Sequence, residues 1–551
     1  MRQFTADAPR RFNRLRLAIV FLLLAAPVCA AVWSVEWFVT QDGSAHLHTA
    51  HLLVELLKGD PVLSEFFAIN PLYVPNSSGH WLLAALLLFF APAVVSKIFV
   101  TLTFLANVWA IVYLCVRVAG RNGLETAVLL ATIIAINGLW FLGFYNFNLG
   151  TALFAATIGY WWKRRENFAL RHAIVLSLLL IANYFSHLIS FGMTTACLMF
   201  LAVFASEPRR IAKNFLWIAA ALLPVVPLLV GYKLMMRAGG EIAPHWRELT
   251  NPYSPASWAK HLFMGDPILL LARQSFPFVE ARPAAFLAAA PSVWFIAALA
   301  CLALACFAAW RRGFRFPPKI AALANFGALC ALAWAVAPDD FGTLHGGVLR
   351  ERILIIGFIC LAPVLCVAPA GFFKRAAQII LIYVALFQIA VLFEYAQTQN
   401  RITSEFVAAT PALDQLEKPV TLASIIMSPD ICRYKSAPLI NLSPLLGVGN
   451  SNIVWDNYEL GNYYFPVVAR SEDARRFSFD FHETNKLNYC YSNEIEDFKF
   501  VRLNEVLREN HNRINTMLVW GANERVEEML AEWYESEPFY KSENVRLFRH
   551  K

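Results

Sequence analysis

Apolar stretches separated by short polar turns occupy the chain from its N-terminal region to about residue 395. Each stretch has about 20 residues, which as a helix is long enough to cross a hydrocarbon core of roughly 30 Å. The pattern predicts eleven spans, at 17–38, 97–117, 124–143, 145–162, 171–187, 189–205, 214–235, 284–309, 319–337, 351–370 and 376–395. The apolar segment 81–92 is too short to span and predicts a helix at the membrane interface.

The composition agrees with this pattern. Of 551 residues, 58% are hydrophobic and only 16% are charged, and the mean hydropathy is +0.50. Such values lie outside the usual range of soluble globular proteins. We therefore predict an integral membrane protein.

Basic residues gather at the turns on one side of the predicted spans. These turns hold Arg10, Arg11, Arg14 and Arg16; Arg117 and Arg121; Lys163, Arg164 and Arg165; Arg209, Arg210 and Lys213; Arg311, Arg312 and Arg315; and Lys374 and Arg375. Cytoplasmic loops carry such an excess, so the N-terminus is predicted inside and the C-terminal segment outside. The net charge of +8 follows from this bias and requires no nucleic-acid partner.

The first span also fits a second interpretation. RRFNRLRLAIVFLLLAAPVCA has the basic start, apolar centre and small-residue end of a cleavable signal peptide. Apolar sequence continues through AVWSVEWFV, which favours an uncleaved helix. Either interpretation leaves residues 40–80 outside.

Residues 399–551 lack this apolar pattern and predict a smaller exported α/β domain after the membrane domain, 1–398. KPVTLASIIMS and INTMLVWG predict buried strands, NERVEEMLAEWYES an amphipathic helix, and FYKSENVRLFRHK a closing strand. Because the helical membrane domain is the larger of the two, the predicted fold class is mainly α. The aromatic segment NSNIVWDNYELGNYYFPVVA could stack on sugars or pack against the membrane domain. Cys432 and Cys490 are free to form a disulfide in an oxidising compartment, and both possibilities stay open.

Three outer loops remain to hold chemistry, at 39–96, 236–283 and 338–350. Most of the twelve histidines map to this outer side: His46, His48, His51, His80, His187, His245, His261 and His345. Histidine tolerates membrane interfaces well, but so one-sided a distribution predicts a polar cavity there.

The segment TQDGSAHLHTAHLLVELLKG follows the first span directly. Gly43 permits a sharp turn, Ser44 is a candidate N-cap, and an amphipathic helix follows. Asp42 precedes this helix, where the positive helix end favours a charged carboxylate. An ionised acid at the membrane rim is a functional candidate, and the alternative is that Asp42 only caps the helix.

Several of these features together resemble the GT-C glycosyltransferases. They are the carboxylate after the first span, the outer loop NPLYVPNSSGHWLLAALL, the many spans and the exported C-terminal domain. Within that superfamily, QDGSAHLHTA, PNSSGHWLLAALL, GFYNFNLGTALF and NYFSHLISFG resemble a bacterial group of predicted membrane proteins. The resemblance implies transfer of a sugar from a polyprenyl-phosphate donor, on the outer face of the bacterial cytoplasmic membrane, to a lipid, glycan or protein acceptor.

The resemblance also assigns candidate roles. Asp42 becomes the catalytic base that accepts the acceptor's proton. Many GT-C enzymes carry Asp-Glu, Asp-Asp or Asp-x-Asp here, whereas Gly43 follows Asp42, so the second carboxylate does not carry over. Arg350 and Arg352, at the outer mouth of the tenth predicted span, are candidates for bidentate contacts to the donor phosphate. Their alternative is that both only extend towards lipid headgroups.

Further polar residues of the outer side are predicted to line the substrate pocket: His46, His80, His187, His345, Asn146 and Tyr73. His187 could instead be satisfied by a neighbouring helix, and Asn146 could belong to an interfacial aromatic belt. A divalent metal held by Asp42, His46 and His187, or by His46 and His80, stays open. No tight ligand spacing such as HExxH is present, so no metal ligand and no firm cofactor is assigned.

A second function class is a non-catalytic transporter, flippase or assembly subunit for cell-surface glycans. The chain carries no nucleotide-binding glycine loop. Acidic residues in mid-span, which an ion-coupled transporter needs, are few. These two features favour the enzyme over the transporter. The predicted partners of this enzyme are membrane lipids and a polyprenyl-phosphate sugar.

Overall fold

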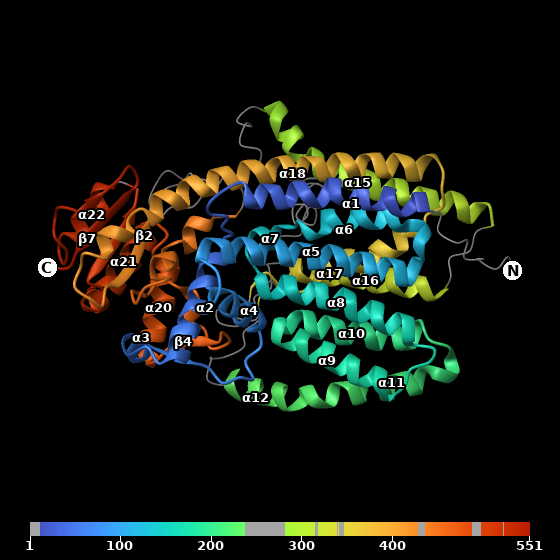
Figure 1. Cartoon of the computed structure of the whole chain (residues 1–551), viewed down its shortest axis with the longest axis horizontal. Coiled ribbons are helices and arrows are strands. Elements are labelled where there is room, and N and C mark those ends of the chain that lie inside the picture. The colour runs from blue at the N-terminus through green and yellow to red at the C-terminus, as the bar shows by residue number, and fades with distance from the viewer. Residues whose placement is uncertain are drawn as a thin grey trace.

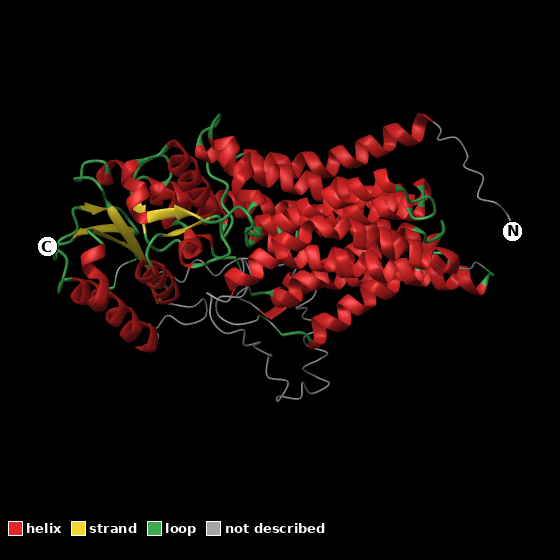
Figure 2. Ribbon diagram, turned by 90° about the horizontal axis from the view of Figure 1, so that it is seen from below, coloured by secondary structure: helices red, strands yellow, loops and turns green. Residues whose placement is uncertain are grey.

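The computed structural model describes residues 11–236, 282–313, 318–338, 340, 347–427, 436–487, 497–521 and 523–551. A bundle of long helices forms one body, and a smaller body that contains the main sheet lies at one end of it (Figure 1). Figure 2 shows the same division, with the strands confined to the end that carries the C-terminus.

Helices occur at each of the eleven predicted positions. They are α1 (Arg11–Trp33), α5 (Pro92–Ala119), α6 (Leu124–Ala135) with α7 (Gly138–Phe141), α8 (Tyr145–Arg164), α9 (Leu170–Ser186), α10 (Leu188–Phe204), α11 (Ile211–Leu222) with α12 (Val226–Met236), α15 (Arg282–Arg311), α16 (Pro318–Val336), α17 (Leu349–Cys366) and α18 (Phe372–Val407). Among the described residues, five helical stretches are by themselves long and apolar enough to cross a membrane. The protein is a multi-pass membrane protein, and the number of spans stays a prediction.

Local sequence explains where the helices of the bundle break. A 3₁₀ turn, Leu223–Val225, separates α11 from α12, at a site where Pro224 and Pro227 each remove a backbone donor. Asn137 ends the stretch begun by α6, and its side chain accepts from the Trp140 N–H at 3.1 Å. Large apolar side chains such as Leu23, Trp109 and Leu178 point outward, as expected where the surrounding solvent is lipid.

The first loop forms α2 (Gly43–Lys58), α3 (Pro61–Phe66), strand β1 (Phe67–Ile69) and α4 (Ser78–Leu87). The predicted short helix at 81–92 is therefore present but begins and ends earlier. Pro92 opens α5 at its first turn, where its missing N–H costs nothing, so this helix starts before the predicted residue 97. Gly59 ends α2 in the left-handed conformation, with φ of 81°.

The C-terminal body contains a five-stranded mixed sheet in the order β3-β2-β5-β7-β6. Its elements are β2 (Thr421–Ile426), β3 (Ile453–Val454), β5 (Thr516–Trp520), β6 (Tyr540–Lys541) and β7 (Val545–Arg549), with α20 (Glu472–Thr484), α21 (Asp497–Asn510) and α22 (Glu524–Leu530). Parallel pairing of β2 with β3 and β5, and antiparallel pairing of β7 with β5, places Leu518 opposite both Ser424 and Leu547. The predicted strands are present, although the closing segment forms two strands, β6 and β7, and the predicted amphipathic helix is present as α22. The location of this domain outside the membrane stays a prediction.

The two bodies share a continuous interface. Helix α18 runs through residue 398 to Val407 and joins them (Figure 1). Strand β1 of the first loop pairs antiparallel with β4 (Val467–Ala469) of the C-terminal body. The buried Trp455 packs against Phe66 and Phe67, so this part of the aromatic segment rests on the first loop. The interface holds α2 between the bundle and the sheet-containing body.

Candidate functional site

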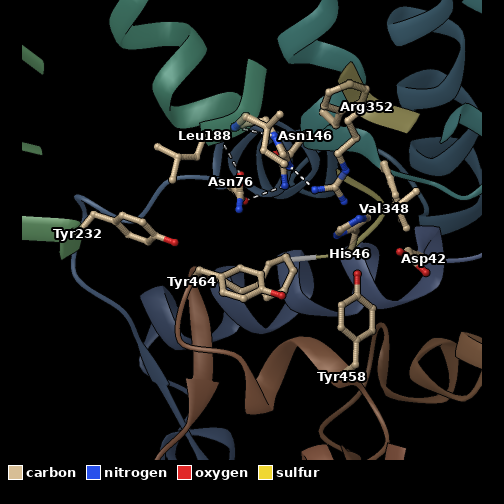
Figure 3. A pocket seen from close by; sticks show the side chains of 16 residues that line it. Asp42, His46, Asn76, Asn146, Leu188, Tyr232, Val348, Arg352, Tyr458 and Tyr464 are labelled. Atoms are coloured by element: carbon tan, nitrogen blue, oxygen red, sulfur yellow. Dashed lines mark hydrogen bonds between the residues drawn. The ribbon is translucent and has the colours of Figure 1, made fainter. Parts of the chain in front are cut away.

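A cavity of about 250 Å³ opens where α2, the bundle and the C-terminal body meet (Figure 3). Its lining is mixed, with carboxylate, imidazole, guanidinium, amide and phenol groups among apolar side chains. The lining residues are Asp42, His46, Asn76, Phe144, Asn146, Phe147, His187, Leu188, Ile189, Tyr232, Gly347, Val348, Arg352, Tyr458, Tyr464 and Phe465. A polar cavity predicted from the histidines is therefore present, and the first loop supplies part of its wall.

Asp42 sits at the start of α2 and faces the cavity. The backbone N–H of Asp42 donates to the Leu142 carbonyl at 3.0 Å, which fixes the turn before α2 against the bundle. Gly43 cannot carry a side chain here, because a Cβ atom would lie 2.6 Å from the Tyr145 hydroxyl. The Asn441 amide donates to Asp42 Oδ1 at 2.8 Å, and the Tyr458 hydroxyl points toward the same region of the cavity (Figure 3).

Burial raises the pKa of Asp42 to about 6, because desolvation outweighs the favourable charge of His46. The carboxylate is therefore ionised at neutral pH and more basic than an exposed one. Its side chain makes no capping hydrogen bond, so the purely capping alternative does not describe it. Asp42, not Ser44, occupies the N-cap position: α2 begins at Gly43, two residues earlier than predicted, and the Ser44 hydroxyl is buried without a partner among the described residues.

His46 and His80 meet at Glu459, which belongs to the short 3₁₀ helix Tyr458–Gly461 of the C-terminal body. His46 Nδ1 lies 2.5 Å from Glu459 Oε1, and His80 Nε2 lies 3.0 Å from Glu459 Oε2. The two ring nitrogens are 3.0 Å apart. Burial alone would raise the pKa of Glu459, but the charges and hydrogen bonds of both imidazoles outweigh it and lower that pKa.

The two arginines that were predicted to bind the donor phosphate, Arg350 and Arg352, lie in different environments. Arg352 lines the cavity, where its guanidinium lies 3.1 Å from His187 Nε2 and over the Phe144 ring. Arg350 turns away from the cavity. Its Nε donates to the Trp334 carbonyl at 2.5 Å, and its guanidinium lies over the Trp334 ring.

Asn146 is a cavity residue with two fixed amide contacts. Its Oδ1 accepts from the Gly79 N–H at 2.7 Å, and its Nδ2 donates to the Asn76 carbonyl at 2.7 Å. The amide therefore holds α4 and the segment before it against α8. Tyr73 lies outside the cavity lining, with its ring against Gly231 of α12. His345 lies outside the described residues.

Sequence reasoning missed two residues that the C-terminal body contributes, Asn441 and Glu459. The aromatic density of the segment around Tyr458 and Tyr464 was the available signal, and those two tyrosines do face the cavity (Figure 3). Glu459 gave no signal, because its partner His80 is 379 positions away in the sequence.

No protein-family model and no curated protein sequence matches the chain. Solved structures do. Two crystal structures of ArnT from Cupriavidus metallidurans, one in the apo state and one bound to undecaprenyl phosphate, each match with a TM-score of 0.51. Their identities are 11% and 10%, and the matches cover 97% and 96% of this chain and 98% and 97% of those chains.

A cryo-EM structure of the arabinofuranosyltransferase AftD from Mycobacteria also matches, with a TM-score of 0.50 and 13% identity. That match covers 99% of this chain but 40% of AftD. ArnT and AftD are membrane glycosyltransferases of the GT-C superfamily. Structural similarity at such low sequence identity shows a shared fold. The chain therefore has the GT-C fold.

Proposed function

We propose that the protein is a glycosyltransferase that moves a sugar from a polyprenyl-phosphate donor to a lipid, glycan or protein acceptor. The reaction takes place on the outer face of the bacterial cytoplasmic membrane. The single observation that carries this proposal is that an ionised, buried carboxylate and a partly buried guanidinium, Asp42 and Arg352, line one cavity. A transferase of this type needs both groups, one for each end of the reaction.

The acceptor end requires a base. In the proposed step, Asp42 takes the proton of an acceptor hydroxyl while that oxygen forms a bond to the anomeric carbon of the donor sugar. The Asn441 and Tyr458 contacts orient the carboxylate. The position of Asp42 at the cavity wall supports this role.

The donor end requires a cation. As the bond between the anomeric carbon and the phosphate oxygen breaks, polyprenyl phosphate leaves with the electron pair and gains negative charge. Arg352 offers a guanidinium for this charge, and its Nε has no hydrogen-bond partner among the described residues. Arg350 is not part of this proposal, because its guanidinium contacts backbone carbonyls. ArnT, which shares the fold, has been seen with undecaprenyl phosphate bound.

The remaining lining suits a sugar. Tyr232, Tyr464 and Phe465 offer aromatic faces. Asn76 and Asn146 supply amide groups near Leu188 (Figure 3). Sugars are bound by such combinations of flat apolar faces and fixed hydrogen-bonding groups. On this basis we assign His46, Asn146 and His187 to the substrate pocket. We assign no direct contact with the substrate to Tyr73.

The test uses the full-length protein in lipid nanodiscs, incubated with a panel of polyprenyl-phosphate sugars and with cell-envelope lipid and glycan fractions as acceptors. Mass spectrometry follows the donor, the glycosylated product and free polyprenyl phosphate. We expect one donor to be consumed with release of free polyprenyl phosphate. Binding of donors without turnover across the whole panel would contradict the proposal.

A further inference from the structure

We propose that His46, His80 and Glu459 form a binding site for one divalent cation of the zinc type. The three side chains come from three separate segments: α2, α4 and the 3₁₀ helix Tyr458–Gly461. Each offers one ligand atom, and these atoms lie within 4.8 Å of one another. This site does not depend on glycosyl transfer, because it follows from the donor set and its geometry alone.

The spacing of the ligand atoms fits one ion. Zinc bonds to imidazole nitrogen are about 2.0 to 2.1 Å long, so ligand atoms at two corners of a tetrahedron are separated by about 3.3 Å. The two imidazole nitrogens are 3.0 Å apart, and their distances to the nearest Glu459 oxygens are 2.5 and 3.0 Å. Outward shifts of a few tenths of an ångström therefore admit a cation between the three groups.

Hydrogen bonds alone satisfy this arrangement poorly. Both ring nitrogens lie within hydrogen-bonding distance of the same carboxylate, and each can donate to it only as an N–H. Two such N–H groups with their nitrogens 3.0 Å apart bring their hydrogens into close approach. A cation replaces both hydrogens and turns the crowded contact into coordination.

The surroundings hold the three ligands in place. His80 and Glu459 have no exposed surface, and His46 is 4% exposed. The Asn457 side chain accepts from the Glu459 N–H at 3.1 Å and donates to the Ala45 carbonyl at 3.3 Å, which anchors the backbone of Glu459 to α2. His80 Nε2 faces Glu459, and the other ring nitrogen, Nδ1, lies 3.4 Å from the Asn146 amide.

The chemistry of the donor set indicates the class of ion. Two imidazoles and one carboxylate are borderline ligands that favour zinc and similar transition metals over magnesium or calcium. Three protein ligands leave a coordination position for water or for a further ligand. His46 also lines the cavity, so the ion would lie at the edge of the proposed active site and join the first loop to the C-terminal body.

The test is made on full-length protein in detergent, stripped with a chelator and then dialysed against zinc chloride. We expect elemental analysis to find one zinc per chain in the wild type. Glu459→Gln and His80→Asn are expected to weaken zinc binding at least about tenfold. His51→Gln is the matched control, because His51 lies on the same helix but contacts the Asn450 carbonyl, and it should bind as the wild type does.

A second measurement decides the question if the variants fail to fold. X-ray absorption of the zinc-loaded wild type should show two imidazole ligands with oxygen completing a four-coordinate shell. Cobalt chloride in place of zinc should give the intense visible bands of four-coordinate cobalt. Zinc content no higher than in Glu459→Gln, an absorption spectrum without imidazole, or only the weak bands of hydrated cobalt would each overturn the site. None of these readouts requires turnover, so failure here is distinct from failure of the proposed function.

Discussion

Two buried carboxylates, on either side of the same interface, meet opposite environments. Asp42 has one amide and one phenol as partners and opens onto the cavity, and burial raises its pKa to about 6. Glu459 is held by two imidazoles, and their charge lowers its pKa although burial acts in the other direction. A carboxylate with a raised pKa can exchange a proton at neutral pH, whereas one held ionised by two imidazoles serves as a fixed negative charge. The comparison assigns proton transfer to Asp42 and ligand binding to Glu459.

The largest expected effect is on Asp42. Asp42→Asn keeps the shape and the contact to Asn441 but removes the proton acceptor, so we expect donor turnover to fall about 100- to 10,000-fold. Initial rates of free polyprenyl phosphate release measure this. Asp60→Asn is the matched control, because Asp60 caps α3 in the same loop and lies away from the cavity lining. Equal losses in the two variants would remove the special role of Asp42.

The next effect separates the two arginines. Arg352→Gln removes a charged donor from the cavity and should weaken binding of the donor about 10- to 100-fold. Arg350→Gln should leave donor affinity unchanged, because Arg350 contacts the carbonyls of α16 instead. Binding of a fluorescent polyprenyl-phosphate sugar to nanodiscs compares the variants. A weaker affinity in Arg350→Gln alone would reverse the assignment.

Glu459 should influence stability more than Asp42 does. Glu459→Gln leaves one or both imidazoles of His46 and His80 without a full partner in a buried site, so we expect a loss of about 1 to 3 kcal/mol in the free energy of unfolding. Thermal unfolding in detergent, without added metal, measures the change. Asp42→Asn should unfold close to the wild type. A larger loss for Asp42→Asn than for Glu459→Gln would break the comparison.

The smallest effect concerns a partner of Asp42. Tyr458→Phe deletes one hydroxyl that lowers the pKa of the Asp42 carboxyl and leaves the ring in place, so turnover should fall up to about tenfold. Donor affinity and unfolding should change little. A rate as low as that of Asp42→Asn would mean that the Tyr458 hydroxyl itself takes part in the chemistry.

The fold was largely predictable because hydrophobic periodicity is a local property. Apolar stretches located the helices, and alternating or continuous apolar runs located β2, β5 and β7. The limits of the helices were less predictable, as the early start of α5 at Pro92 shows. Asp42 was predictable for the same reason, because the residues next to it in the sequence define its position after a span and before a helix.

The rest of the site depends on contacts between distant parts of the chain. Glu459 reaches His80 across 379 positions, and no local pattern marks such a pair. Arg350 and Arg352 show a different limit. Residues two apart on a helix do not face the same direction, so only one of them could line the cavity, and the sequence did not indicate which.

The most direct test of glycosyl transfer uses wild-type protein in proteoliposomes loaded with one polyprenyl-phosphate sugar and an acceptor. It measures together the free polyprenyl phosphate that appears and the intact donor that changes leaflet. A transferase releases free polyprenyl phosphate in proportion to glycosylated acceptor while the leaflet distribution of the donor stays constant. Intact donor that crosses between leaflets without release of polyprenyl phosphate would contradict the transferase and identify a carrier.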